Sequence, residues 1–255
     1  MDPNSILSLA ADAGQIILEN GGETYRVEET INHICSAFGM TVSDCFALPT
    51  GIMLSVVDRE QKSYSLVRRI TKRSIDLEKI SRVNNLVRNL KPDERYNQIH
   101  KNLKRLDSAR PYPAFLFIPA GGLCAACFTW LFGGSLREAA VAFAVGLILK
   151  LFTYLLGLIR FNHFFSNLTG AVLAAALALV SVRLGLAAKA DMIIIGSIML
   201  LVPGILIVNS IRDIMAGDLV AGVARLVEAF ILAAAIAAGN AIVIALWVLM
   251  GKGSL

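Results

Sequence analysis

Three charged residues stand inside long apolar stretches of the sequence. Lys150 lies in the middle of one apolar block, and Arg225 and Glu228 lie three residues apart near the start of another. If these blocks are membrane helices, a charge near the bilayer centre costs on the order of 3 kcal/mol and must face protein or water. The three residues are therefore candidates for a polar pathway. In the alternative interpretation, Arg225 and Glu228 form a structural pair on one helix face, and Lys150 extends toward the membrane surface.

A helix-breaking dipeptide and a dense polar segment follow one another later in the chain. Pro203-Gly204 interrupts an apolar block, and because proline removes a backbone hydrogen bond, we expect a break or kink there. Broken membrane helices often line cavities or substrate sites, although a plain packing kink is the alternative. The polar residues that follow are Asn209, Ser210, Arg212, Asp213 and Asp218.

These residue types suit the movement of a small polar solute. Lys150, Arg212 and Arg225 can bind a carboxylate, and Glu228 or Asp213 can carry a proton. The sequence has no nucleophile–base set, metal-ligand cluster or nucleotide-binding loop, so we expect no enzyme activity, metal or cofactor, and we expect coupling to an ion gradient. The candidate substrate-pathway residues are Lys150, Pro203, Gly204, Asn209, Arg212, Asp213, Asp218, Arg225 and Glu228.

The elements that must position these residues fall into two chemically different parts. Residues 1–110 carry 16 Lys/Arg and 14 Asp/Glu, whereas residues 111–255 carry 8 and 5. The second part consists of long apolar blocks, and the mean hydropathy of the whole chain is +0.66. Because about 20 apolar residues span a bilayer core, we predict a soluble head at 1–110 and a transmembrane helical domain at 111–255.

Five helical spans can be drawn in the second part. The last is too long for a straight crossing of a ~30 Å core, so we expect it to tilt or to break near Gly239-Asn240. The predicted spans are 114–133, 138–159, 164–182, 190–209 and 219–249.

The head is predicted to be α+β. Apolar residues at helical spacing indicate a first helix, capped by Asn4 or Ser5 and ending at Glu19 before Gly21-Gly22, and a second that ends at Gly39. Alternating residues and turn signals then indicate three strands of an antiparallel meander. The predicted elements are helices to 19, from 24, at 76–89 and at 93–106 (with Pro92 at its start), and strands at 41–48, 52–58 and 63–70.

Positive charge before the first span sets the expected orientation. Lys101, Lys104, Arg105 and Arg110 precede it. Because cytoplasmic flanks of membrane helices are enriched in Lys and Arg, we predict a multi-pass protein of the cell (inner or plasma) membrane with a cytoplasmic head and an external C-terminus. The head's charges are interleaved in sign, so nucleic-acid binding is not expected.

Several stretches resemble the threonine/serine exporter family. In the head they are Gly21-Gly22-Glu23-Thr24-Tyr25-Arg26-Val27-Glu28 and Leu48-Pro49-Thr50-Gly51-Ile52, and later Pro203-Gly204, Asn209-Ser210-Ile211-Arg212-Asp213, Gly217-Asp218 and Arg225-Leu226-Val227-Glu228-Ala229. The resemblance covers nearly the whole chain. Full-length members of that family have about ten spans, so the chain is similar to the larger component of a split, succinate-exporter-like version.

The resemblance implies a subunit of a secondary exporter for threonine, serine or a dicarboxylate such as succinate. Its expected partner is a small integral membrane protein that supplies the second membrane half, or further copies of the chain. The alternative is a membrane-anchored sensory or regulatory subunit whose head binds a ligand or partner. A pure anchor has no need of Lys150, Arg225, Glu228 and a Pro-Gly break.

Overall fold

The chain forms two compact units. The computed structural model describes residues 2–58, 60–90, 96–109, 112–159 and 161–251, with the side chains of Val42 and Ser43 left undescribed. The first unit contains Met1–Pro111 together with Gly204–Val227, and the second contains Tyr112–Pro203 together with Glu228–Leu255. The segment Gly204–Val227 thus groups with the N-terminal region, beyond the predicted head of residues 1–110.

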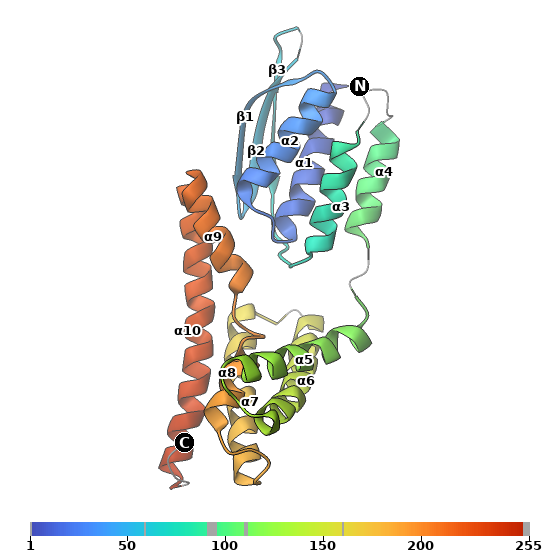
Figure 1. The fold of residues 1–255 in the computed structure, drawn as a ribbon. Coiled ribbons are helices and arrows are strands. Elements are labelled where there is room, and N and C mark those ends of the chain that lie inside the picture. The colour runs from blue at the N-terminus through green and yellow to red at the C-terminus, as the bar shows by residue number, and fades with distance from the viewer. Residues whose placement is uncertain (1, 59, 91–95, 110–111, 160, 252–255) are drawn as a thin grey trace. The chain divides into compact units, whose positions relative to one another are not determined.

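Two helices form the middle layer of the first unit (Figure 1). They are α1 (Pro3–Glu19) and α2 (Thr24–Ala37), which pack against each other and on the sheet. Their apolar residues recur at helical spacing, as the sequence predicts, and form one continuous core. Fully buried members of that core include Leu9, Ile17, Val27, Ile31 and Ile34.

The ends of these helices follow local sequence signals, with one correction. Asp2 caps α1 by accepting a hydrogen bond from the backbone N–H of Ser5, at 3.2 Å. The predicted cap at Asn4 or Ser5 is therefore wrong, because Pro3 already occupies the first turn, where its missing N–H is not needed. The predicted end of α2 is confirmed, since Gly39 has a φ of +75° just after the helix.

A three-stranded antiparallel sheet forms the outer layer. Its strands, in the order β1-β2-β3, are Thr41–Leu48, Gly51–Val57 and Ser63–Arg69, each within one residue of its predicted bounds. Alternation along β2 directs Ile52, Leu54 and Val56 into the core, against α1 and α2.

Helices α3 (Leu77–Arg88) and α4 (Tyr96–Asp107) form the third layer and pack on α1. Asp76 caps α3 through the backbone N–H of Lys79, at 3.0 Å. The predicted start of the last head helix at Pro92 and Asp93 lies outside the described residues.

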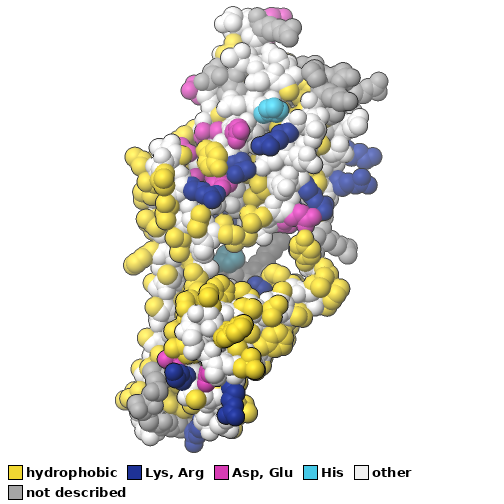
Figure 2. All heavy atoms as spheres, viewed as in Figure 1, with side chains coloured by type: hydrophobic (Ala, Val, Ile, Leu, Met, Phe, Trp, Pro, Cys, Tyr) yellow, Lys and Arg dark blue, Asp and Glu magenta, His cyan; other side chains and the backbone are white. Residues whose placement is uncertain are grey.

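Four helices in the described part of the chain are long and apolar enough to cross a membrane: α5 (Ala114–Leu131), α6 (Leu136–Leu158), α7 (His163–Arg183) and α10 (Leu219–Leu249). Hydrophobic side chains cover much of the visible surface over α5 and α6 (Figure 2). Small residues allow close helix packing: a Cβ on Gly146 of α6 would lie 2.7 Å from that of Ala125 on α5.

A buried carboxylate fastens the loops of the second unit. Glu138 and Ser135 form a capping box at the start of α6. The other carboxylate oxygen of Glu138 accepts hydrogen bonds from the backbone N–H groups of Ala188 and Lys189, at 2.9 and 3.3 Å. One side chain therefore connects the α5–α6 turn to the loop before the helix α8 (Ala190–Ile198).

The predicted span 190–209 is not one continuous helix. α8 (Ala190–Ile198) has nine residues, the chain from 199 to 203 is non-helical, and α9 (Gly204–Ala216) follows. The break expected at Pro203-Gly204 is thereby confirmed, because proline cannot continue the helical hydrogen bonding.

The last helix, α10, is continuous through Gly239-Asn240, so the alternative of a break there is wrong. Gly239 instead permits close packing on α7, since a Cβ at this position would lie 2.9 Å from that of Ala171. Residues Leu219–Val227 of α10 belong to the first unit, and Glu228–Leu249 belong to the second. The latter stretch alone is long enough to cross a bilayer core of ~30 Å.

Candidate functional site

The turn between α1 and α2 presents backbone carbonyls to the segment 204–227 of the same unit. Gly21 has a φ of +89°, which favours glycine, and a Cβ on Gly22 would lie 2.9 Å from the carbonyl oxygen of Ile17. Asn209 donates its amide N–H to the Gly21 carbonyl at 2.8 Å, and the Arg225 guanidinium donates to the Gly22 carbonyl, also at 2.8 Å. Both glycines are therefore needed to shape this contact.

Thr24 brings two carboxylates together at the start of α2. Its hydroxyl oxygen lies 2.8 Å from Asp213 Oδ1 and 2.9 Å from Asp218 Oδ2, and its backbone N–H lies 3.3 Å from Asp213 Oδ1. A threonine hydroxyl has one proton to donate. Thr24 therefore cannot donate a full-strength hydrogen bond to both carboxylates at once.

Asp213 also forms a buried ion pair. Its side chain is fully buried, that of Arg225 is 6% exposed, and Arg225 Nε lies 3.3 Å from Asp213 Oδ2. Although the charges are close, Oδ2 accepts no well-aligned hydrogen bond within the described residues. Removing one member of such a pair costs about 3–5 kcal/mol, because the remaining buried charge loses its counter-charge.

Glu23 holds two arginines from different elements. Its carboxylate accepts from Arg26 Nε at 3.0 Å and from Arg212 Nη1 at 2.6 Å. Burial acts to raise the pKa of Glu23, but a backbone hydrogen bond and the bonds from Arg212 and Arg26 outweigh it and hold the pKa below 4.5. Glu23 is therefore an ionised anchor for both guanidinium groups.

The pKa of Glu28, about one turn further along α2, is shifted in the opposite direction. Burial raises its pKa above 4.5 despite a hydrogen bond from the backbone N–H of Ala47, and the negative charges of Asp218 and Asp213 raise it further. The cluster around Thr24 thus carries more carboxyl groups than its cations balance locally.

We call Thr24, Asp213, Asp218 and Arg225, with the carbonyls of Gly21 and Gly22, the motif network.

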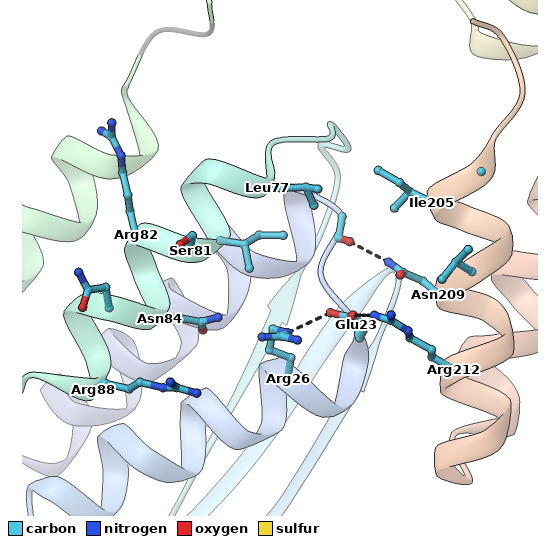
Figure 3. A pocket seen from close by; sticks show the side chains of 15 residues that line it. Glu23, Arg26, Leu77, Ser81, Arg82, Asn84, Arg88, Ile205, Asn209 and Arg212 are labelled. Carbon is cyan, nitrogen blue, oxygen red and sulfur yellow. Dashed lines mark hydrogen bonds and ion pairs between the residues drawn. The ribbon is translucent and has the colours of Figure 1, made fainter. Parts of the chain in front are cut away.

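An open cleft of about 750 Å³ adjoins the motif network. It is lined by the start of α2, by α3 and by α9, all in the first unit. Figure 3 shows Arg26 and Arg212 directed at Glu23 from opposite sides, with Asn84 and Arg88 contributed by α3. The volume is typical of small-molecule sites.

The predicted pathway residues divide between the two units. Asp213, Asp218 and Arg225 belong to the motif network, and Asn209 donates to its Gly21 carbonyl. Gly204, Asn209 and Arg212 line the cleft. Pro203, Lys150 and Glu228 belong to the second unit.

Lys150 of α6 packs on α5 instead of joining the motif network. Its Nζ lies 4.1 Å from the ring centroid of Phe117, and its aliphatic stem lies against Gly121. A cation over an aromatic ring is partly compensated for lost water. This contact accounts for a half-buried lysine in an apolar helix.

The sequence reasoning missed the chemical part played by the head. Gly21, Gly22, Glu23 and Thr24 contact segment 204–227 directly, and Arg26 and Arg88 line the cleft. The available signal was that both contacting stretches carried the family resemblance. Nothing in their spacing, 189 residues from Thr24 to Asp213, indicated that they meet.

These features define a helical membrane protein with an α+β head and a buried polar network. The family model described as "Putative threonine/serine exporter" matches residues 8–247, and the chain belongs to this threonine/serine exporter family. No solved structure matches the chain.

Curated relatives carry two kinds of name. The chain is 23% identical to the "Probable succinate transporter subunit YjjP" of Klebsiella aerogenes, over 98% of this chain and 97% of that protein. The Escherichia coli protein of the same name is also 23% identical, with 97% and 96% covered. The chain is 26% identical to the "Threonine/serine exporter" of Corynebacterium glutamicum, covering 92% of this chain but only 50% of that protein.

Proposed function

We propose that the chain is a subunit of a secondary exporter of small polar metabolites that carry a carboxylate. Threonine, serine or a dicarboxylate such as succinate is the expected substrate class. The observation that carries this proposal is the family match over residues 8–247. The names of the relatives, one group a threonine/serine exporter and the other a succinate transporter subunit, supply the substrate class.

A small integral membrane protein is proposed to complete the exporter. The chain spans about half the length of the Corynebacterium relative but nearly all of the Klebsiella transporter subunit. This difference supports a split transporter whose second membrane half is a separate chain. Assembly from several copies of this chain is the other arrangement that would supply more spans.

Five membrane crossings are proposed, with a broken fourth. That α9 and the start of α10 belong to the same compact unit as the head supports the proposal that they lie on the head's side of the membrane. In this arrangement α5, α6 and α7 each cross the membrane, which leaves the end of α7 on the opposite side. A further crossing is therefore needed before α9. α8 rises about 14 Å, and the five residues after it reach at most about 17 Å. Together they can cross a ~30 Å core.

The head is proposed to be cytoplasmic. Lys101, Lys104 and Arg105 of α4 precede the first span, together with Arg110 outside the described residues. This cluster follows the rule that positive flanks stay inside. With five crossings, the C-terminus is external.

The motif network and the broken crossing are proposed to belong to the transport pathway. The pathway residues remain Lys150, Pro203, Gly204, Asn209, Arg212, Asp213, Asp218, Arg225 and Glu228. Non-helical backbone at membrane depth is tolerated where it lines a cavity, which suits Pro203-Gly204. The Asp213–Thr24–Asp218 arrangement, in which two carboxyl groups share one hydroxyl, supports proton coupling.

An efflux measurement tests the proposal. Cells lacking their own exporters are loaded with succinate, threonine or serine, and they express this chain, the partner, or both. We expect efflux of at least one substrate only when both chains are present. Efflux that never rises above that of empty cells for any of the three would reject the exporter, and full export by the purified monomer in liposomes would reject the partner.

A further inference from the structure

The cleft of the first unit has a clear excess of positive charge. Arg26, Arg82, Arg88 and Arg212 line it, and Glu23 is its one acidic lining residue in the described chain. Glu23 already binds Arg26 and Arg212, so one carboxylate is shared by two guanidinium groups. Among the described lining residues, four guanidinium groups therefore stand against one carboxylate.

The two arginines of α3 differ in their partners. Arg82 pairs with Glu78 on its own helix at 2.5 Å and extends away from Glu23 in Figure 3. Arg88 lies within ion-pair distance of no acidic side chain among the described residues, and it is exposed to the cleft. A guanidinium group offers paired N–H donors whose geometry matches a carboxylate. Arg88 is thus available to bind one.

Uncharged hydrogen-bonding groups lie between these cations. Asn84 and Asn85 of α3 and Asn209 of α9 line the same cleft. The wall also includes Leu77 and Ile80, which can contact a short aliphatic backbone. Most residues that line the cleft are polar or charged, and its volume of about 750 Å³ lies in the range of small-molecule sites.

We propose that this cleft binds a small carboxylate anion, with Arg88 as the principal charged contact and Asn84 and Asn85 as hydrogen-bonding contacts. The inference rests on the proposed function only for its choice of test ligands, which are the metabolite class to be exported. The bound anion also lies beside Arg26 and Arg212. The anion therefore competes with Glu23 for these guanidinium groups. Because Arg212 and Asp213 both lie on α9, binding of the anion also affects the helix that carries Asp213.

Direct binding to the purified full chain in detergent tests the cleft without transport. Isothermal titration is performed with succinate, with threonine and with succinamide, the uncharged analogue of succinate. We expect saturable binding of at least one carboxylate and none of succinamide. Arg88→Gln is expected to weaken binding about tenfold, or about 1.4 kcal/mol, and Arg88→Lys to weaken it less. The matched control is Arg69→Gln, which removes an exposed charge from β3, outside the cleft.

The proposal is overturned if neither carboxylate binds, if succinamide binds equally well, or if Arg69→Gln weakens binding as much as Arg88→Gln. Its failure is distinguishable from failure of the exporter. If the protein binds a carboxylate but exports nothing, the cleft proposal stands and the exporter is rejected. If it exports but no carboxylate binds to the cleft, the exporter stands and the cleft proposal is rejected.

Discussion

Thr24 offers one hydroxyl proton to two carboxylates, and this mismatch is the most chemically suggestive feature of the motif network. Asp213 also forms the buried ion pair with Arg225. The two carboxyl groups, which share the Thr24 hydroxyl, are the proposed site of proton coupling.

Asp218→Asn tests proton coupling through this pair of carboxyl groups. The asparagine amide can donate to the Thr24 hydroxyl as a protonated carboxyl would, so we expect normal insertion of the protein. Export, measured with the partner at several imposed pH gradients, is expected to lose its dependence on the gradient. Asp44→Asn, an exposed change on β1, is the control. Wild-type gradient dependence in Asp218→Asn would contradict proton coupling through this pair.

Glu28→Gln tests the electrostatics around the motif network. The folded state raises the pKa of Glu28 above 4.5, so its favourable contribution is present at low pH and is lost as pH rises through the folded-state pKa. Glutamine keeps an oxygen for the N–H of Ala47 but has no charge. We expect a higher thermal unfolding temperature than wild type at neutral pH and a shrinking difference toward pH 4.5. An equal difference at every pH would contradict this account.

At the scale of elements, glycines set how closely the helices of the second unit approach. A Cβ on Gly196 of α8 would overlap the Thr129 hydroxyl and lie 2.7 Å from the Thr129 backbone nitrogen, whereas a Cβ on Gly157 of α6 would meet nothing within 4 Å. The two positions are a matched pair, because both are helical glycines of the same unit.

Gly196→Ala is expected to destabilise the protein by about 1–3 kcal/mol through overpacking. Gly157→Ala is expected to be neutral or to stabilise by up to about 1 kcal/mol, because alanine favours helix. Thermal stability and the yield of monodisperse protein in detergent measure both. Equal behaviour of the two variants would show that α5 and α8 do not pack as closely as described.

Local sequence signals were sufficient for most elements. Period-2 alternation and the turn at Pro49-Thr50-Gly51 predicted the meander, and glycines predicted the ends of α1 and α2, because these features depend on neighbouring residues alone. The span 190–209 was harder. Hydropathy reports only that a stretch is apolar, so it joined α8 to the first residues of α9 despite the Pro-Gly signal between them.

At the scale of the whole molecule, the main surprise is that segment Gly204–Val227 belongs with the head. Sequence reasoning grouped Asn209, Arg212, Asp213 and Asp218 as a polar patch between two spans and paired Arg225 with Glu228. Their partners, Gly21 to Thr24, lie almost 190 residues earlier, and no local pattern encodes such a contact. α10 is longer than one membrane crossing for the same reason, because its first turns belong to the unit that contains the head.

Reporter fusions test the proposed five crossings. A reporter at Asn97 is expected on the cytoplasmic side and one after Leu255 on the outside. The broken fourth crossing brings the total to five, and an odd number of crossings puts the two ends on opposite sides. Additional fusions in the α6–α7 and α7–α8 loops are expected inside and outside, respectively. Reporters at Asn97 and after Leu255 on the same side would contradict five crossings.

The most direct test of the central claim, that the motif network works in transport and is more than a structural tie, is the double replacement of its buried ion pair. Arg225→Leu and Asp213→Leu are made singly and together, and protein abundance and efflux are measured in the same cells with the partner present. Each single change is expected to lower abundance, because removing one member of a buried ion pair costs about 3–5 kcal/mol. We predict that the double variant recovers abundance but not efflux. Recovery of both would contradict a role of the motif network in transport.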